Sequence, residues 1–285
     1  MSFSDIEISN EDGRPVWLYE FRLATKYWRY TSADRDIPWG GDPEDPDIWA
    51  AETIFHEQIT QGGSSDDLQI PIQPNLDIVP LFRVNSPSQS LWLTIRRRHQ
   101  GDPDDEAPVA WVGTVSNIKQ DSEAQATVFA VSISATFDRN GVWLGWGRNC
   151  PLSLYGRGCN NQGSNDPSDH AYPATLATNG GNQITIEEEI VPSEGSFTGG
   201  YFEWETLDGF TERRGIEVAL DESTFSILGL VGDIEEGTEI TLYPGCARNT
   251  TNCKLFGSGP RGNLDNYGGF PHLPGKSPFD GTPVF

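Results

Sequence analysis

The sequence predicts a mainly β protein with two barrel- or sandwich-like domains, long loops and few, short helices. Three observations support this prediction. Apolar residues recur at every second position, as at Leu91, Leu93 and Ile95, which is the spacing of a half-buried strand. The 285 residues include 31 glycines and 20 prolines, many of them in runs that form turns. No segment carries the long apolar stripe of an amphipathic helix.

The expected strands follow one another along most of the chain. After residues 91–95, the same alternation predicts inward-facing side chains in four further segments. These are Phe129, Val131, Ile133, Ala135 and Phe137; Ile184, Ile186 and Ile190; Ile216, Val218 and Leu220; and Ile240 with Leu242. The candidates for a short helix lie near Asp34 and between Asp47 and Phe55.

The chain is long enough for two domains with hydrophobic cores of their own. We expect an N-terminal β domain over residues 1–145 and a C-terminal β domain, carrying the cysteine segment, over residues 146–285. Residues 156–182 are rich in glycine and asparagine, a composition that predicts a long irregular loop. A loop of this length needs an anchor, which a bound metal would provide.

The four cysteines form two close pairs, Cys150 with Cys159 and Cys246 with Cys253. In a reducing cytosol such pairs hold metal more often than they form disulfides. Four thiolates suit an iron–sulfur cluster and a structural zinc, because soft sulfur binds both. Eight residues separate the first pair and six the second, whereas zinc knuckles usually have about two to four. The wider spacing favours an iron–sulfur cluster, which is wider than a single zinc ion.

Composition excludes several classes of function. A net charge of −23 argues against a phosphate-binding surface, so no direct, sequence-specific binding of nucleic acid is expected. No apolar stretch approaches the roughly 20 residues that span a bilayer, and Met1–Asp5 lacks the pattern of a signal peptide. We therefore expect a soluble protein made in the cytosol.

The one basic run, Arg96–His99, precedes the acidic residues 102–106 and predicts a solvated hairpin end.

No catalytic residues are predicted. The histidines show no metal-binding spacing such as His-x-x-x-His; they are His56, His99, His170 and His272. A cysteine hydrolase would use one thiol and leave the other three without a role. Neighbouring acids such as Glu187 and Glu188 would point to opposite faces of a strand, which does not suit a pair of catalytic carboxylates.

Several segments resemble the tail-tip and baseplate hub proteins of long-tailed bacteriophages (siphophages), the family of the lambda tail tip protein L and the gene transfer agent hub. They are Leu18–Phe21, Trp28–Asp34, Cys150–Cys159, Gly245–Arg248, Cys253–Phe256 and Gly268–Pro274. The resemblance thus covers most of the chain. One segment departs from it, because residues 257–263 are longer and richer in glycine than the family pattern.

The resemblance implies a structural protein of the virion, not an enzyme. Such a hub is a homotrimer, assembled in the bacterial cytoplasm, that joins the tail tube and the distal tail protein to a central tip or fibre protein. The tape measure protein is a further expected partner. The resemblance also implies a structural iron–sulfur cluster, expected to be [4Fe–4S], on Cys150, Cys159, Cys246 and Cys253. Gly158 and Gly245, which directly precede two of these ligands, would let the backbone donate N–H groups to sulfur.

Three alternatives remain open at the level of sequence. The first is a structural protein stabilised by zinc on the same four cysteines. The second is a cytosolic iron–sulfur redox enzyme on a β scaffold. The third is a secreted adhesin with two disulfides.

Overall fold

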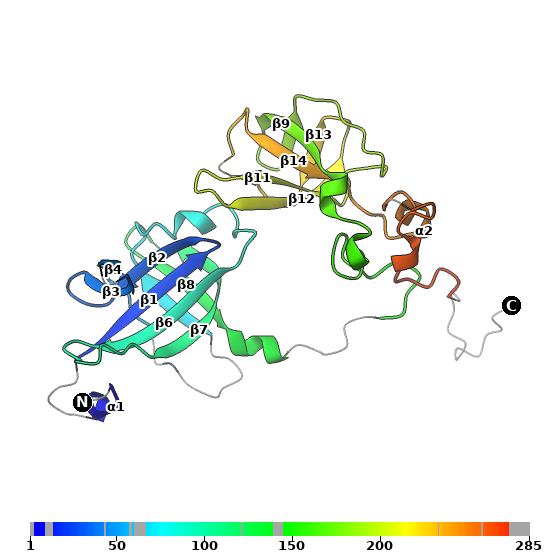
Figure 1. The fold of residues 1–285 in the computed structure, drawn as a ribbon. Helices are drawn as coiled ribbons and strands as arrows, with labels where there is room; N and C mark the ends of the chain where they lie inside the picture. Colours follow the sequence, from blue (N-terminus) through cyan, green and yellow to red (C-terminus); the bar gives the residue numbers. More distant parts are fainter. Residues whose placement is uncertain are drawn as a thin grey trace, which may run out of the picture. The chain divides into compact units, whose positions relative to one another are not determined.

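The structure, a computed structural model, is mainly β with few short helices (Figure 1). It describes residues 3–8, 14–42, 44–56, 59, 67–120, 122–138, 145–232, 234–257 and 259–273. The chain forms two compact units, Met1–Asn140 and Gly141–Phe285. Residues 139–144, just before the division expected after residue 145, lie outside the described residues. Among the helices of the described part, none is long and apolar enough to cross a membrane.

The first unit is built on one eight-stranded sheet with the strand order β3-β4-β2-β1-β6-β7-β8-β5. Neighbouring strands are antiparallel except β2 and β4, which run parallel. The strands are β1 (Pro15–Leu23), β2 (Lys26–Thr31), β3 (Ile37–Asp42), β4 (Asp45–Ala51), β5 (Leu68–Ile72), β6 (Leu91–His99), β7 (Val109–Gln120) and β8 (Ala126–Ser132). The helices are α1 (Phe3–Ile8) and the 3₁₀ turns η1 (Pro80–Phe82) and η2 (Ile133–Asp138).

The core of this sheet lies where the sequence alternation predicted it for β6. Leu91, Leu93 and Ile95 are at most 1% exposed. Leu93 is paired across the strands with Phe21 of β1, which is fully buried. Burying a large apolar side chain of this kind stabilises the fold by about 1.5–3 kcal/mol.

Two sequence predictions are wrong in this unit. β8 ends at Ser132, so the expected strand does not reach Ile133, Ala135 and Phe137, which lie in η2. Phe137 is 85% exposed. The buried row of β8 is the opposite one, with Ala126, Val128 and Ala130 at most 1% exposed. The expected short helix is also absent from both of its candidate segments, because residues 32–35 form a bend and Asp45–Ala51 pairs with β3 and β2 as strand β4.

The basic run at the end of β6 is neutralised by nearby acids. Arg98 forms an ion pair with Asp105, Nε to Oδ1 2.7 Å, as expected from the acidic segment that follows. Arg97 and His99 both bind Glu7 of α1, and the His99 Nε2 to Glu7 Oε2 distance is 2.7 Å. His99 is only 1% exposed, so the hairpin end is less solvated than predicted.

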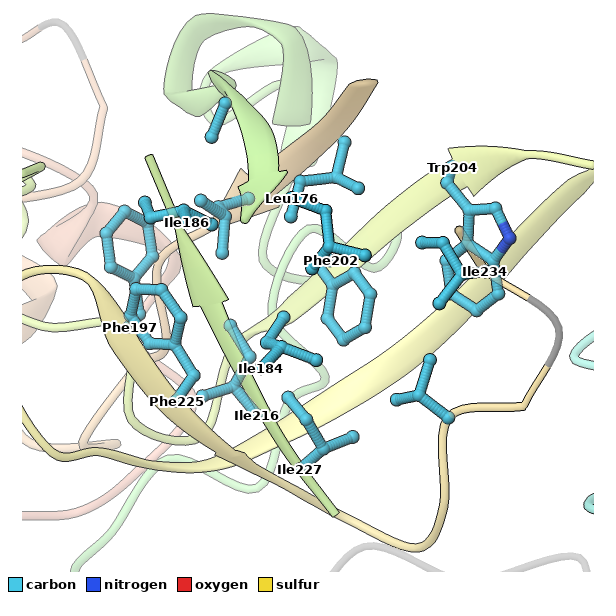
Figure 2. Packing of buried hydrophobic residues seen from close by; sticks show 14 residues of the cluster. Leu176, Ile184, Ile186, Phe197, Phe202, Trp204, Ile216, Phe225, Ile227 and Ile234 are labelled. Atoms are coloured by element: carbon cyan, nitrogen blue, oxygen red, sulfur yellow. The ribbon is translucent and has the colours of Figure 1, made fainter. Parts of the chain in front are cut away.

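The second unit contains a closed, six-stranded antiparallel barrel with the order β10-β13-β12-β11-β14-β9. Its strands are β9 (Tyr172–Asn179), β10 (Gln183–Ile186), β11 (Tyr201–Glu205), β12 (Thr211–Ala219), β13 (Thr224–Ile227) and β14 (Glu239–Tyr243). Figure 2 shows Leu176, Ile184, Phe202 and Phe225 among the side chains that fill its interior, and all four are fully buried. The buried side chains Ile240 and Leu242 complete the predicted row of β14.

The alternation predicted for residues 216–220 ends at a β-bulge. The pairing of β12 with β13 shifts register between Ile216 and Val218. Ile216 is 2% exposed, whereas Val218 and Leu220 are 41% and 57% exposed. An extra residue in a bulge turns the side chains after it toward the other face.

The remainder of the second unit forms irregular segments outside the barrel. Residues 145–171 precede β9, and residues 244–273 follow β14. Their described residues form short helical turns, namely η3 (Asn161–Gly163), η4 (Pro167–His170), α2 (Thr250–Cys253) and η5 (Leu264–Asn266). We call these two segments together the cysteine lobe, because they carry all four cysteines.

Candidate metal centre

The four cysteines line a single cavity in the cysteine lobe. Its volume is about 60 Å³, in a measure where one water needs about 10–15 Å³. Leu152, Leu154 and Tyr267 cover parts of its wall. The structure therefore brings together all four residues that the sequence singled out, from positions before and after the barrel.

Backbone hydrogen bonds between the two segments close the lobe around this cavity. The Cys150 N–H donates to Arg248 O at 2.9 Å, and the Phe270 N–H donates to Gly147 O at 2.8 Å. Within the second pair, Asn249 caps α2 by accepting the Asn252 N–H at 2.8 Å. The asparagine of the Asn249-Thr250-Thr251 sequence thus has a structural role at the start of α2.

The four sulfurs have different hydrogen-bond partners. The Cys159 Sγ accepts from two side-chain amides, Asn165 Nδ2 at 3.3 Å and Asn263 Nδ2 at 3.2 Å. The Cys246 Sγ accepts from the Arg248 N–H at 3.3 Å, and the Cys150 Sγ from the Gly268 N–H at 3.4 Å. The buried Cys253 Sγ donates to Asn263 O at 3.3 Å. N–H groups directed at sulfur are typical of metal-bound thiolates.

The N–H groups that donate to the cysteine sulfurs do not come from Gly158 and Gly245, as the sequence had predicted. The Gly245 N–H donates to Ser196 O at 3.0 Å, away from sulfur. Gly245 is required for another reason, since a Cβ there would lie 2.0 Å from Thr198 O and 2.6 Å from Gly199 C. The chain leaving β14 passes directly against the 198–200 turn, and this close contact places Cys246 at the cavity.

Alanine at Gly245 is expected to destabilise the second unit by about 1–3 kcal/mol, because the neighbouring atoms are backbone and cannot rotate away. Urea unfolding followed by tryptophan fluorescence measures this loss. Gly147→Ala is the matched control, since nothing lies within 4 Å of its added Cβ. Equal stability of the two variants would contradict the close contact.

Burial and mutual repulsion act on the thiols of the second pair. Burial, and then the charges of Cys246, Cys159 and Cys150, raise the pKa of the Cys253 thiol to about 11. Burial likewise raises the pKa of Cys246, with Cys159 and Cys150 adding to the effect. Four thiolates this close repel one another, so a cationic group would be needed to hold them together in the ionised form.

The four cysteines around one cavity supply the sulfur donors of a metal or metal–sulfur centre. Among the described residues, no set of three or more His, Cys, Asp or Glu side chains is placed to hold a metal ion. Here the sulfurs surround a space that could take several waters, and N–H groups face three of them. The residues present therefore fit a cysteine-ligated cluster.

A second polar group joins the cysteine lobe to the barrel. His170 Nδ1 donates to the carboxylate of Glu194, and Tyr172 of β9 donates to the same carboxylate at 2.7 Å. His170 is 7% and Glu194 3% exposed. Burial acts to raise the pKa of Glu194, but the hydrogen bonds from His170 and Tyr172 outweigh it and the pKa is lowered.

Aromatic rings surround this buried pair. Tyr155, from between the first two cysteines, stacks on His170 with ring centroids 5.8 Å apart, and Phe256 packs against His170 edge-on at 5.2 Å. The Asn252 side chain, from between the second two, donates to Glu194 O at 2.9 Å. His170 belongs to this junction and does not line the cysteine cavity. We call Tyr155, His170, Tyr172, Glu194 and Phe256 the junction cluster.

Comparisons with known proteins agree in part with the sequence resemblance. The family model described as phage conserved hypothetical protein BR0599 matches residues 195–277. An uncharacterised protein of Xylella fastidiosa (strain 9a5c) is 29% identical over 177 residues, which are 56% of this chain and 35% of that protein. The chain thus spans about a third of that relative's length.

A solved structure is similar to this chain over its full length. It is a chain of the virion of a native gene transfer agent particle, with a TM-score of 0.72 and 16% sequence identity, covering 100% of this chain and 99% of that one. At this identity the likeness shows the fold. The fold of this chain therefore also occurs in that virion.

Proposed function

We propose that this protein is a structural component of a phage or phage-like virion, at the tail tip or baseplate. The observation that carries the proposal is the full-length likeness to a chain of the gene transfer agent virion. The match of residues 195–277 to a phage family model adds further support, because it covers strands β11–β14 of the barrel and the whole second cysteine segment.

In this role the protein is a hub. It assembles as a homotrimer and joins the tail tube and the distal tail protein to the central tip or fibre protein, with the tape measure protein as a further contact. Its function is to hold a shape, so no residue is given a catalytic role. The net charge of −23 would keep packaged nucleic acid from adhering to the hub.

The proposed cofactor is a structural iron–sulfur cluster held by Cys150, Cys159, Cys246 and Cys253. When bound, the cluster would cross-link the two segments of the cysteine lobe. The shared cavity and the N–H groups facing the sulfurs support this assignment. The protein's own contribution is to place the four thiols, and the junction cluster fixes that lobe to the barrel.

Deletion of the gene in the strain that produces the particles tests the hub. We expect tailless particles or particles without a tip in electron micrographs, restored by the wild-type gene supplied from a plasmid. Particles of normal form and infectivity from the deletion strain would contradict the proposal.

Metal analysis of anaerobically purified protein tests the cluster. We expect equal amounts of iron and acid-labile sulfide and a brown colour that dithionite bleaches. Stoichiometric zinc in a colourless protein would replace the cluster with the zinc alternative. Metal-free protein without free thiols would indicate disulfides instead.

A further inference from the structure

The hydrogen bonds around the cavity are concentrated on one sulfur. The Cys159 Sγ accepts from two side-chain amides, while the sulfurs of Cys150 and Cys246 are each faced by a single backbone N–H. The two amides come from different segments of the lobe. Asn165 follows Cys159 by six residues, and Asn263 follows Cys253 by ten.

Both asparagines are almost completely buried, Asn165 at 0% and Asn263 at 3% exposure. Burying an amide costs free energy unless it finds good partners, and a neutral thiol is a weak acceptor. An ionised or metal-bound sulfur is a much stronger one. Asn165 Oδ1 is buried without a partner, so the hydrogen bond to Cys159 Sγ is the contact that its side chain makes. A negatively charged sulfur would therefore explain why these two amides are buried beside Cys159 Sγ.

Asn263 also couples the two cysteine pairs. Its Nδ2 donates to Cys159 O at 2.9 Å as well as to the sulfur, and its own backbone bonds to Cys253 on both sides. Asn266 Nδ2 donates to Asn263 Oδ1 at 2.7 Å, which fixes the orientation of the Asn263 amide.

The turn before Asn263 depends on glycine. Gly262 has φ +59°, and a Cβ there would lie 2.2 Å from Lys254 O. The glycine-rich segment 257–263 thus brings Asn263 back against the residues that follow Cys253. This gives a reason for the segment in which the sequence departs from the resembling family.

We propose that Asn165 and Asn263 are positioning residues that make Cys159 the most strongly hydrogen-bonded ligand and raise the reduction potential of the cluster. The inference rests on the proposed cluster. Reduction adds one electron, supplied by an electrode, and increases the negative charge on the ligand sulfurs. Hydrogen bonds to sulfur stabilise that added charge, so they favour the reduced state.

Asn165→Leu is the first test, because leucine has a similar volume and also removes the unpartnered Oδ1. The backbone bond from Asn165 N to Asn160 Oδ1, 3.0 Å long, does not involve the replaced side chain. Asn263→Leu is the second, since it removes the donor to Cys159 at a similar volume and adds no charge. Protein-film voltammetry of the full chain measures the potential. We expect each loss to disfavour the reduced state about tenfold, a downward shift of about 59 mV for a one-electron couple.

Asn179→Leu is the matched control. It removes three side-chain hydrogen bonds in the barrel, to Gly232 O, Ile234 O and the Gly181 N–H, without touching the cysteine cavity. The potential of this variant should equal that of the wild type. A lowered potential in either loaded cavity variant supports the inference. If both cavity variants have the potential of the wild type, the inference about the asparagines is wrong, but the proposed cluster is unaffected. If the wild-type protein contains no iron, both the cluster and the inference are wrong.

Discussion

Serine in place of Cys246 is expected to abolish iron retention and to loosen residues 244–273, while the barrel remains folded. The cluster would link Cys159 to Cys246, positions that are about 90 residues apart. Closing a loop of this size stabilises the folded state by about 4–5 kcal/mol in the chain-entropy model. Iron analysis measures the first effect, and hydrogen exchange of residues 244–273 measures the second.

The other three Cys→Ser variants should lose iron to the same extent, because the ligands act as a unit. Lys254→Ala is a suitable control, since Lys254 is exposed and lies next to Cys253 without contributing a thiol. A Cys246→Ser protein with full iron content would contradict the assignment of Cys246 as a ligand.

Leucine in place of Glu194 should destabilise the second unit by about 1–3 kcal/mol for each buried donor that is left without a partner. The reason is that His170 Nδ1 and the Tyr172 hydroxyl would lose the carboxylate to which they donate. Thermal or urea unfolding measures the loss. Since the junction cluster joins the cysteine lobe to the barrel, exchange of amide hydrogens near Tyr155 and Phe256 should rise as well.

Glu194 should also make stability depend on pH. Its pKa is lowered in the folded protein, so its contribution is present above the ordinary glutamate value of 4.5 and is lost as the pH falls below it. Glu194→Gln should therefore remove part of the acid sensitivity, seen in urea midpoints from neutral pH downward. Glu236→Gln, an exposed position, is the control. The same acid sensitivity in Glu194→Gln and wild type would refute the role of this carboxylate.

The alternation of apolar residues predicted the β class and several buried rows, but it failed where both faces of a strand are apolar. In β8 the small residues Ala126 and Ala130 form the buried row, while Phe129 and Val131 lie on the other face. Because both rows are hydrophobic, the larger side chains gave the wrong face. In β12 the predicted buried face is correct at Ile216, but the bulge that follows turns the later side chains outward. A bulge has no clear signal in a single sequence.

The candidate site was likewise predicted only in part from the sequence. The spacing and context of the four cysteines predicted a shared site, and all four line one cavity. The amide donors Asn165 and Asn263 were missed, because asparagine in a loop rich in asparagine has no period that marks it as buried. The close turn at Gly262 was the available signal, since a glycine-rich segment before an asparagine can reflect a tight backbone contact.

The two ends of the eight-stranded sheet also constrain assembly. Its terminal strands, β3 and β5, each contain a proline, Pro38 and Pro71. Proline lacks the backbone donor that an added strand would need, so neither border offers a complete template for β-augmentation or for aggregation through exposed strand edges. Copies packed at high local concentration, as in a ring, would then recognise one another through side chains and loops.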